Sequence, residues 1–134
     1  LKLFVDTSVW SLALRRDART PCAEVAALSR ALESGTLICT TGLVLQELLQ
    51  GFHGPRARDQ IIERFAALPL LTPDRDDHVS AANLRNECRR NGAQIGTIDA
   101  LLAQLCIRFE LIMLTTDADF LRVAKIHPLA LWHE

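Results

Sequence analysis

Short apolar runs alternate with amphipathic segments along this chain, and this alternation restricts the fold more than any other feature of the sequence. The runs at 1–5, 36–40 and 111–115 have the length and apolar content of buried strands. The segments between them repeat apolar residues at helical spacing. Strands and helices in alternation predict an α/β fold whose mostly parallel sheet is covered by helices on both faces.

Local signals predict where the elements begin and end. Two further short strands are expected at 70–71 and 129–132. Helices are expected at 9–16, 22–34, 43–50, 55–68, 74–90, 98–109 and 117–125. The residues predicted to cap, begin or end these helices are Thr7 or Ser8, Gly35, Thr41, Pro55 and Thr97.

The composition is that of an ordinary globular domain. With 134 residues, of which 49% are hydrophobic, the chain is expected to form a single domain over 1–134. No apolar run is long enough to span a bilayer and no signal-peptide pattern is present, so we expect a cytoplasmic protein with no membrane contact. The four cysteines form no CxxC pair, which favours buried reduced thiols over a zinc site.

Four acidic residues lie near the predicted carboxyl ends of strands, where ligands bind in open parallel sheets. Asp6 and Asp117 follow apolar runs, Asp99 lies in the first turn of a predicted helix, and Glu47 lies in an otherwise apolar helix. Each has a simpler explanation when taken alone. An aspartate near a helix start caps the helix or interacts with its dipole, and Glu47 is solvated on an exposed face.

Considered together, the four acids favour a metal site. Carboxylates in one cleft repel one another and raise one another's pKa, and a bound divalent cation removes that penalty. An oxygen-only ligand set suits Mg²⁺ or Mn²⁺. Such a site serves phosphoryl-ester chemistry, because the metal polarises the phosphate and lowers the pKa of an attacking water.

The four acids lie in four short motifs, which occur in the order FVDTSVW, VLQELLQG, IGTIDALLA and LTTDADF. Together these motifs resemble the PIN-domain ribonucleases, specifically the toxins of VapBC toxin–antitoxin pairs, over nearly the whole chain. The resemblance implies a three-layer α/β/α PIN-like fold with a mostly parallel sheet of four to five short strands. It also implies a metal-dependent endoribonuclease that cuts RNA with Mg²⁺ or Mn²⁺.

The resemblance also assigns roles to the matching residues. Asp6, Glu47, Asp99 and Asp117 would form the active site. Asp6, Asp99 and Asp117 would bind the metal, and Glu47 would orient or deprotonate the attacking water. The positions implied to support these acids are Ser8, Thr115 and Asp119. For Asp119, helix capping is the simpler account.

Two groups of arginines are candidates for RNA contact, although the net charge of −1 gives no overall nucleic-acid signal. Arg15, Arg16 and Arg19 lie at and just after the end of the first predicted helix, and solvated helix ends are the simpler interpretation of both groups. The second group ends the helix before the loop that leads to Asp99, so it is the preferred RNA-binding candidate. It consists of Arg85, Arg89 and Arg90.

The resemblance further implies a cognate antitoxin protein and a homodimer. A group of apolar residues in the first two helices is the candidate groove for an antitoxin helix, with core packing as the simpler interpretation. This group comprises Trp10, Leu12, Leu14, Val25, Leu28 and Leu32. In such pairs a basic antitoxin side chain can reach the acidic pocket and block metal or RNA.

Three other functions stay open at this point. A phosphohydrolase with an aspartyl nucleophile needs a second acid two residues after the first, where this chain has Ser8. A receiver-like signalling domain needs paired acids after the first strand and a lysine after the last strands, and the LTTDADF region has no lysine. A catalytically silent PIN-fold binding module would keep the fold and lack turnover, which sequence does not test.

Overall fold

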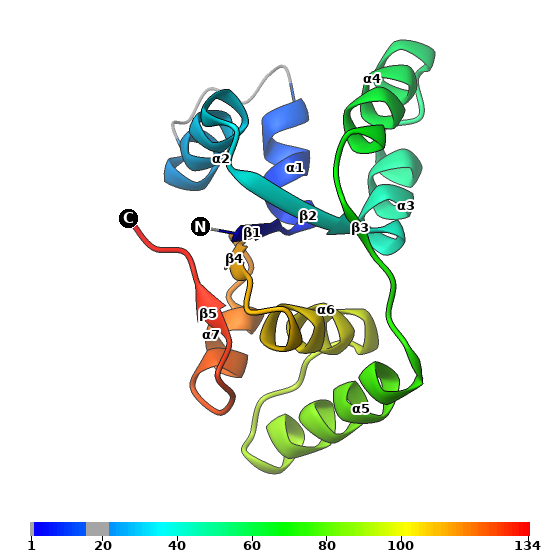
Figure 1. Ribbon diagram of the computed structural model, residues 1–134. Helices are drawn as coiled ribbons and strands as arrows, with labels where there is room; N and C mark the ends of the chain where they lie inside the picture. The colour runs from blue at the N-terminus through cyan, green and yellow to red at the C-terminus, as the bar shows by residue number, and fades with distance from the viewer. Residues whose placement is uncertain (1, 16–21) are drawn as a thin grey trace.

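A five-stranded parallel sheet forms the centre of the molecule (Figure 1). The computed structural model describes residues 2–15 and 22–134. The strands are β1 (Lys2–Val5), β2 (Leu37–Thr41), β3 (Leu70–Leu71), β4 (Ile112–Leu114) and β5 (Ala130–Leu131). Their order is β3-β2-β1-β4-β5, and every neighbouring pair is parallel. The predicted parallel sheet is confirmed.

Helices cover both faces of this sheet, so the predicted three-layer α/β/α architecture is confirmed as well. They are α1 (Thr7–Leu14), α2 (Ala23–Ser34), α3 (Gly42–Gly51), α4 (Pro55–Ala66), α5 (Arg75–Arg90), α6 (Thr97–Arg108) and α7 (Asp119–Ala124). In Figure 1, α1 to α4 lie above the sheet and α5 to α7 lie below it. None of these helices, within the ranges described, is long and apolar enough to cross a membrane.

The strand order places a topological switch point between β1 and β4. The chain leaves β1 toward β2 on one side and leaves β4 toward β5 on the other. At such a point the connections diverge and leave room for a ligand beyond the carboxyl ends of the strands. Val5, which is fully buried, pairs in register with Leu114. The residues that follow these two strands therefore meet at one edge of the sheet.

Several predicted helix boundaries are confirmed and have clear local causes. The Thr41 hydroxyl accepts a hydrogen bond from the Val44 amide at 3.2 Å and caps α3. Gly35 ends α2 with a φ of 72°, a left-handed conformation that glycine adopts without steric cost. Pro55 is the first residue of α4, where its missing amide proton costs nothing.

The prediction for the first helix is wrong at its start. α1 begins at Thr7 with Asp6 in the capping position, so neither Thr7 nor Ser8 caps it. The Ser8 hydroxyl instead donates to the Asp6 carboxylate. The helix ends at Leu14, and Arg15 has an extended backbone, so the predicted end at residue 16 is also too late.

Later boundaries differ from the prediction by one or two residues, and two of these differences concern predicted cap or site residues. Gly96 precedes α6, so Thr97 is the first residue of that helix and not its cap. The helix predicted at 117–125 begins only at Asp119. The Asp117 carboxylate accepts a hydrogen bond from the Asp119 amide at 2.9 Å, and this turn keeps Asp117 out of the helix.

The cysteines are free thiols, and three of them are buried as predicted. Burial raises the pKa of Cys39, Cys88 and Cys106, so these thiols stay protonated at neutral pH. Cys22 departs from the prediction, because it is only half-buried.

Candidate active site

Asp6 lies directly after β1 and is fixed from several directions. Its amide donates to the Leu114 carbonyl at 2.9 Å, which extends the β1–β4 pairing by one step. Its Oδ2 accepts hydrogen bonds from Ser8 Oγ and from Thr115 Oγ1, each at 2.8 Å. The residue is only 6% exposed. Two hydroxyls thus hold one carboxylate oxygen, which orients the group at the sheet edge.

The segment after β4 forms a turn that depends on the same hydroxyls. The Thr116 amide donates to Ser8 Oγ at 3.1 Å, and the Asp117 amide donates to Thr115 Oγ1 at 3.0 Å. Ser8 and Thr115 therefore connect the Asp6 carboxylate to the backbone that carries Asp117. This connection explains why small hydroxyl residues stand at both positions.

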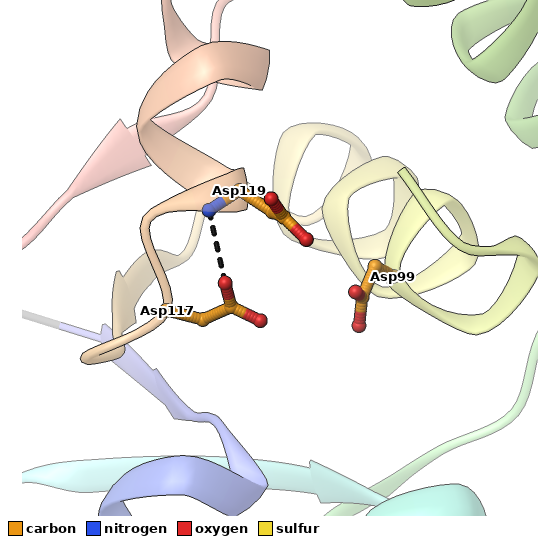
Figure 2. A group of neighbouring side chains, drawn as sticks. All are labelled: Asp99, Asp117 and Asp119. Atoms are coloured by element: carbon orange, nitrogen blue, oxygen red, sulfur yellow. Dashed lines mark hydrogen bonds between the residues drawn. The ribbon is translucent and has the colours of Figure 1, made fainter. Parts of the chain in front are cut away.

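Three carboxylates converge where this turn faces the start of α6 (Figure 2). One oxygen from each of Asp99, Asp117 and Asp119 lies within 4.8 Å of the others. Asp99 comes from the third residue of α6, and the other two come from the turn before α7 and its first residue. All three are partly buried. We call these residues the aspartate triad.

Asp6 and Glu47 lie outside the aspartate triad but act on it through their charge. The pKa of Asp99 is raised to about 6, first by burial and then by Asp6, Asp117, Asp119 and Glu47. Burial, followed by the charge of Asp6, also raises the pKa of Glu47, although its side chain is exposed to solvent. The structure thus places all four predicted acids and Asp119 close enough for their charges to interact, and we call this group of five acids the pocket.

The donor set of this pocket fits a hard divalent cation. Its groups are carboxylate oxygens, which Mg²⁺ and Mn²⁺ prefer, and the pKa of Asp99 is raised by burial and then by the neighbouring acids, two effects that a bound cation offsets. The sequence predicts Asp6, Asp99 and Asp117 as the metal ligands. In the structure, Asp99 and Asp117 have Asp119 as the third residue of the aspartate triad. Asp6 is fixed nearby through Oδ2, by Ser8 and Thr115.

Asp99→Asn is expected to stabilise the metal-free protein at neutral pH. The pKa of Asp99 is about 6 in the folded state against an ordinary 3.8, so the folded state holds its proton more tightly. The free energy of unfolding of the parent therefore falls as pH rises between about 4 and 6. In urea titrations with EDTA, we expect the variant to be more stable by about 1 kcal/mol at about pH 7.5, a value reduced for solvent screening. The difference should vanish below about pH 4. A difference that is equal at both pH values would contradict the repulsion.

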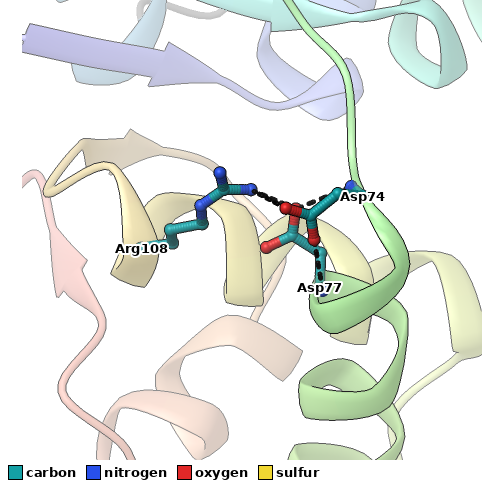
Figure 3. A network of polar contacts seen from close by, with 3 residues as sticks. All are labelled: Asp74, Asp77 and Arg108. Atoms are coloured by element: carbon teal, nitrogen blue, oxygen red, sulfur yellow. Dashed lines mark hydrogen bonds and ion pairs between the residues drawn. The ribbon is translucent and has the colours of Figure 1, made fainter.

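The position of α6, and hence of Asp99, depends on a polar network with α5 (Figure 3). Asp74 and Asp77 form a reciprocal capping box, in which each carboxylate accepts from the other's amide at 2.9 Å. Arg108 pairs with the buried Asp77 and lies 3.3 Å from Asp74. The last turn of α6 is thereby attached to the first turn of α5.

One basic side chain reaches the pocket. Arg122 forms an ion pair with Asp119 one turn earlier in α7. In the part of the chain that the structure describes, the five acids of the pocket make no other ion pair. Among the residues that the structure describes, Arg122 is therefore the basic residue paired with an acid of this group.

The predicted RNA-binding arginines have different surroundings. Arg85 donates from Nε to the Ile95 carbonyl at 2.9 Å and fixes the loop before α6. Arg89 and Arg90 are exposed at the end of α5. Their role in RNA contact stays a prediction. In the other group of arginines, the residues outside the described ranges are Arg16 and Arg19.

The sequence matches the model of a known protein family. The family described as PIN domain matches residues 3–126, which include all five acids of the pocket. The chain belongs to the PIN domain family. No curated protein sequence matches it significantly.

Solved structures share the fold of this PIN domain at low sequence identity. A chain of VapBC2 from Rickettsia felis bound to a promoter DNA fragment superposes with a TM-score of 0.73 and 19% identity, covering 99% of this chain and 100% of the other. VapBC-1 from nontypeable Haemophilus influenzae gives 0.74 and 15%, covering 98% and 97%. VapC20 from Mycobacterium tuberculosis, a sarcin–ricin loop cleaving toxin, gives 0.66 and 20%, covering 88% and 92%. At these identities the likeness shows the fold alone.

A concave surface of this PIN domain lies away from the five acids. It is a groove of about 610 Å³ between α1, α2 and α4. Its apolar lining includes Trp10, Leu14, Leu28, Leu32, Ile61 and Phe65. Of the six apolar residues suggested by the sequence, Leu12 and Val25 are not among those that line it. The third wall comes from α4, where the Phe65 ring lies 5.0 Å from that of Trp10.

Two features of this PIN domain were missed from the sequence. Arg122 lies three residues after Asp119, a helical spacing that brings the two side chains together and that was already contained in the helix expected at 117–125. The contribution of α4 to the groove had no local signal, because Ile61 and Phe65 fit an ordinary buried helix face.

Proposed function

We propose that this PIN domain is a metal-dependent endoribonuclease that acts as the toxin of a toxin–antitoxin pair. The observation that carries this proposal is the aspartate triad, whose carboxylate oxygens lie within 4.8 Å of one another beside the fixed carboxylate of Asp6. Related folds support it, since one is described as a toxin that cleaves the sarcin–ricin loop and others as VapBC complexes. We infer a single cytoplasmic domain.

In this proposal the aspartate triad and Asp6 hold Mg²⁺ or Mn²⁺ through carboxylate oxygens. When bound, the cation supplies charge stabilisation at the phosphate and lowers the pKa of a water molecule. Glu47 orients or deprotonates the attacking water. Its raised pKa suits that role, because a general base works best when its pKa approaches the working pH.

Ser8 and Thr115 are positioning residues in this scheme. Their hydroxyls donate to the same oxygen of Asp6, so the second carboxylate oxygen is available as a metal ligand. Removing either hydroxyl would let the carboxylate rotate. Ser8 and Thr115 therefore fix the geometry of metal binding and transfer no proton.

Removal of metal is the direct test of this function. We expect purified protein to cut total cellular RNA into discrete fragments with Mg²⁺ or Mn²⁺ and to leave it intact in EDTA, because the acids alone repel the phosphate backbone. Fragment patterns on denaturing gels measure this. Cutting that persists in EDTA would rule out the metal-dependent mechanism.

The partners follow from the same proposal. We assign the groove between α1, α2 and α4 to the apolar face of an antitoxin helix, because its apolar floor has charged rim residues, Glu63 and Arg64, suited to an amphipathic partner. A homodimer is proposed from the resemblance alone.

Leu32→Asp should weaken the complex with the product of the neighbouring small gene by about tenfold or more, while exposed Val79→Asp on α5 should not. Calorimetric titration decides between these outcomes.

A further inference from the structure

Arg122 and Asp119 form an ion pair at the rim of the acidic pocket. Both lie in the six-residue helix α7, three positions apart, and their side chains are 53% and 33% exposed. Asp119 belongs at the same time to the aspartate triad. One carboxylate therefore has two competing cationic partners, the guanidinium of its own helix and the divalent cation of the proposed site.

The two partners differ in strength. An exposed ion pair between neighbouring helix residues is weak, because water screens it and both side chains lose freedom on pairing. A divalent cation held by several carboxylates interacts far more strongly with each of them. Metal binding is therefore expected to displace Arg122 from Asp119.

A displaced Arg122 guanidinium stays near the acids, because its side chain is anchored on α7. It is exposed, always charged, and presents paired donors that match the oxygens of a phosphodiester. Arg85, the part-buried arginine predicted to bind RNA, is less suited, because its Nε is already bonded to the Ile95 carbonyl. Among the basic residues of the described ranges, Arg122 is thus the one that forms an ion pair with an acid of the pocket.

We propose that Arg122 is a phosphate-binding residue of the RNA site: it pairs with Asp119 in the metal-free protein and turns to the RNA backbone when the metal ion takes Asp119. This inference rests on the proposed function. It explains how a pocket with five acids acquires a contact for a polyanion only when it is loaded with metal.

The first measurement is metal affinity, which does not depend on activity. We expect Arg122→Gln to bind Mn²⁺ about two- to fivefold more tightly than the parent in calorimetric titrations, because a competitor for Asp119 is gone. Arg122→Lys should stay close to the parent. Lys125→Gln is the matched control, since it removes one exposed positive charge directly after the same helix. In an Asp119→Asn background, Arg122→Gln should no longer change the affinity.

The second measurement is RNA affinity. Fluorescence anisotropy with a labelled random RNA oligonucleotide is performed in a Glu47→Gln background, which keeps the aspartates and slows cleavage. With Mn²⁺, Arg122→Gln should weaken RNA binding about five- to tenfold and lower the slope of log affinity against log salt by about one. In EDTA the same substitution should have no effect.

The outcomes separate this inference from the function on which it rests. If the parent binds no Mn²⁺ or Mg²⁺, the proposed function fails and the role of Arg122 fails with it. If the parent binds metal and cuts RNA but Arg122→Gln leaves either metal affinity or metal-dependent RNA affinity unchanged, only the role of Arg122 is overturned. An equal loss with Lys125→Gln would likewise overturn it, because the effect would then be one of overall charge.

Discussion

Asp99→Asn is expected to reduce RNA cleavage by about 100-fold or more at a fixed concentration of Mg²⁺ or Mn²⁺. The substitution keeps the shape of the side chain and removes one full negative charge from the aspartate triad. A loss of about 3 kcal/mol in binding the cation and the transition state corresponds to about 100-fold. Initial rates on a defined RNA, measured across a metal titration, give this effect.

Two comparisons make this expectation specific. Asp59→Asn removes the same charge from an exposed position on α4 and should leave the rate within about twofold, because it carries no buried contact. Asp6→Asn should lose activity to a similar degree as Asp99→Asn. Growth should stop on expression of the parent and continue on expression of Asp99→Asn. If Asp99→Asn cleaves as well as the parent, the mechanism proposed for the pocket is wrong.

The fold could be predicted from the sequence because its determinants are local and repeated. Apolar runs followed by helix caps appear several times, and a parallel sheet places all such strand ends at one edge. This rule brings residues as distant as Asp6 and Asp117 together without any knowledge of packing. The structure does place both in the same pocket, with Ser8 and Thr115 connecting them.

The finer geometry could not be predicted, because it depends on side-chain contacts that spacing does not encode. Asp119 joins the aspartate triad since the Asp117 carboxylate bonds its amide and delays the start of α7. Helix capping is the simpler prediction for Asp119, but α7 has no side-chain cap, and the Asp117 carboxylate accepts from the Asp119 amide in the turn before it. The pairing of Arg122 with Asp119 follows from their spacing of three residues within α7.

α7 is too short to hold these residues by itself. Helices of fewer than about 12 residues are marginal in water, so a six-residue helix depends on tertiary packing. Phe120 and Val123 supply that packing, and both are fully buried. Phe120 lies between the pocket residue Asp119 and the exposed Leu121, so one turn of helix couples the core to the acids.

Phe120→Ala is therefore expected to lower the free energy of unfolding by about 3–5 kcal/mol, because it removes a large fully buried ring and leaves a cavity. This is a large share of the stability of a typical domain, so Phe120→Leu serves as a milder variant. Leu121→Ala, at a position that is 58% exposed, should change it by no more than about 0.5 kcal/mol. Urea denaturation in EDTA measures all three. Metal affinity should weaken with Phe120→Leu and not with Leu121→Ala, because of these two side chains only that of Phe120 packs in the core next to Asp119. Equal metal affinities in these two variants would show that the acids are positioned independently of the core beneath α7.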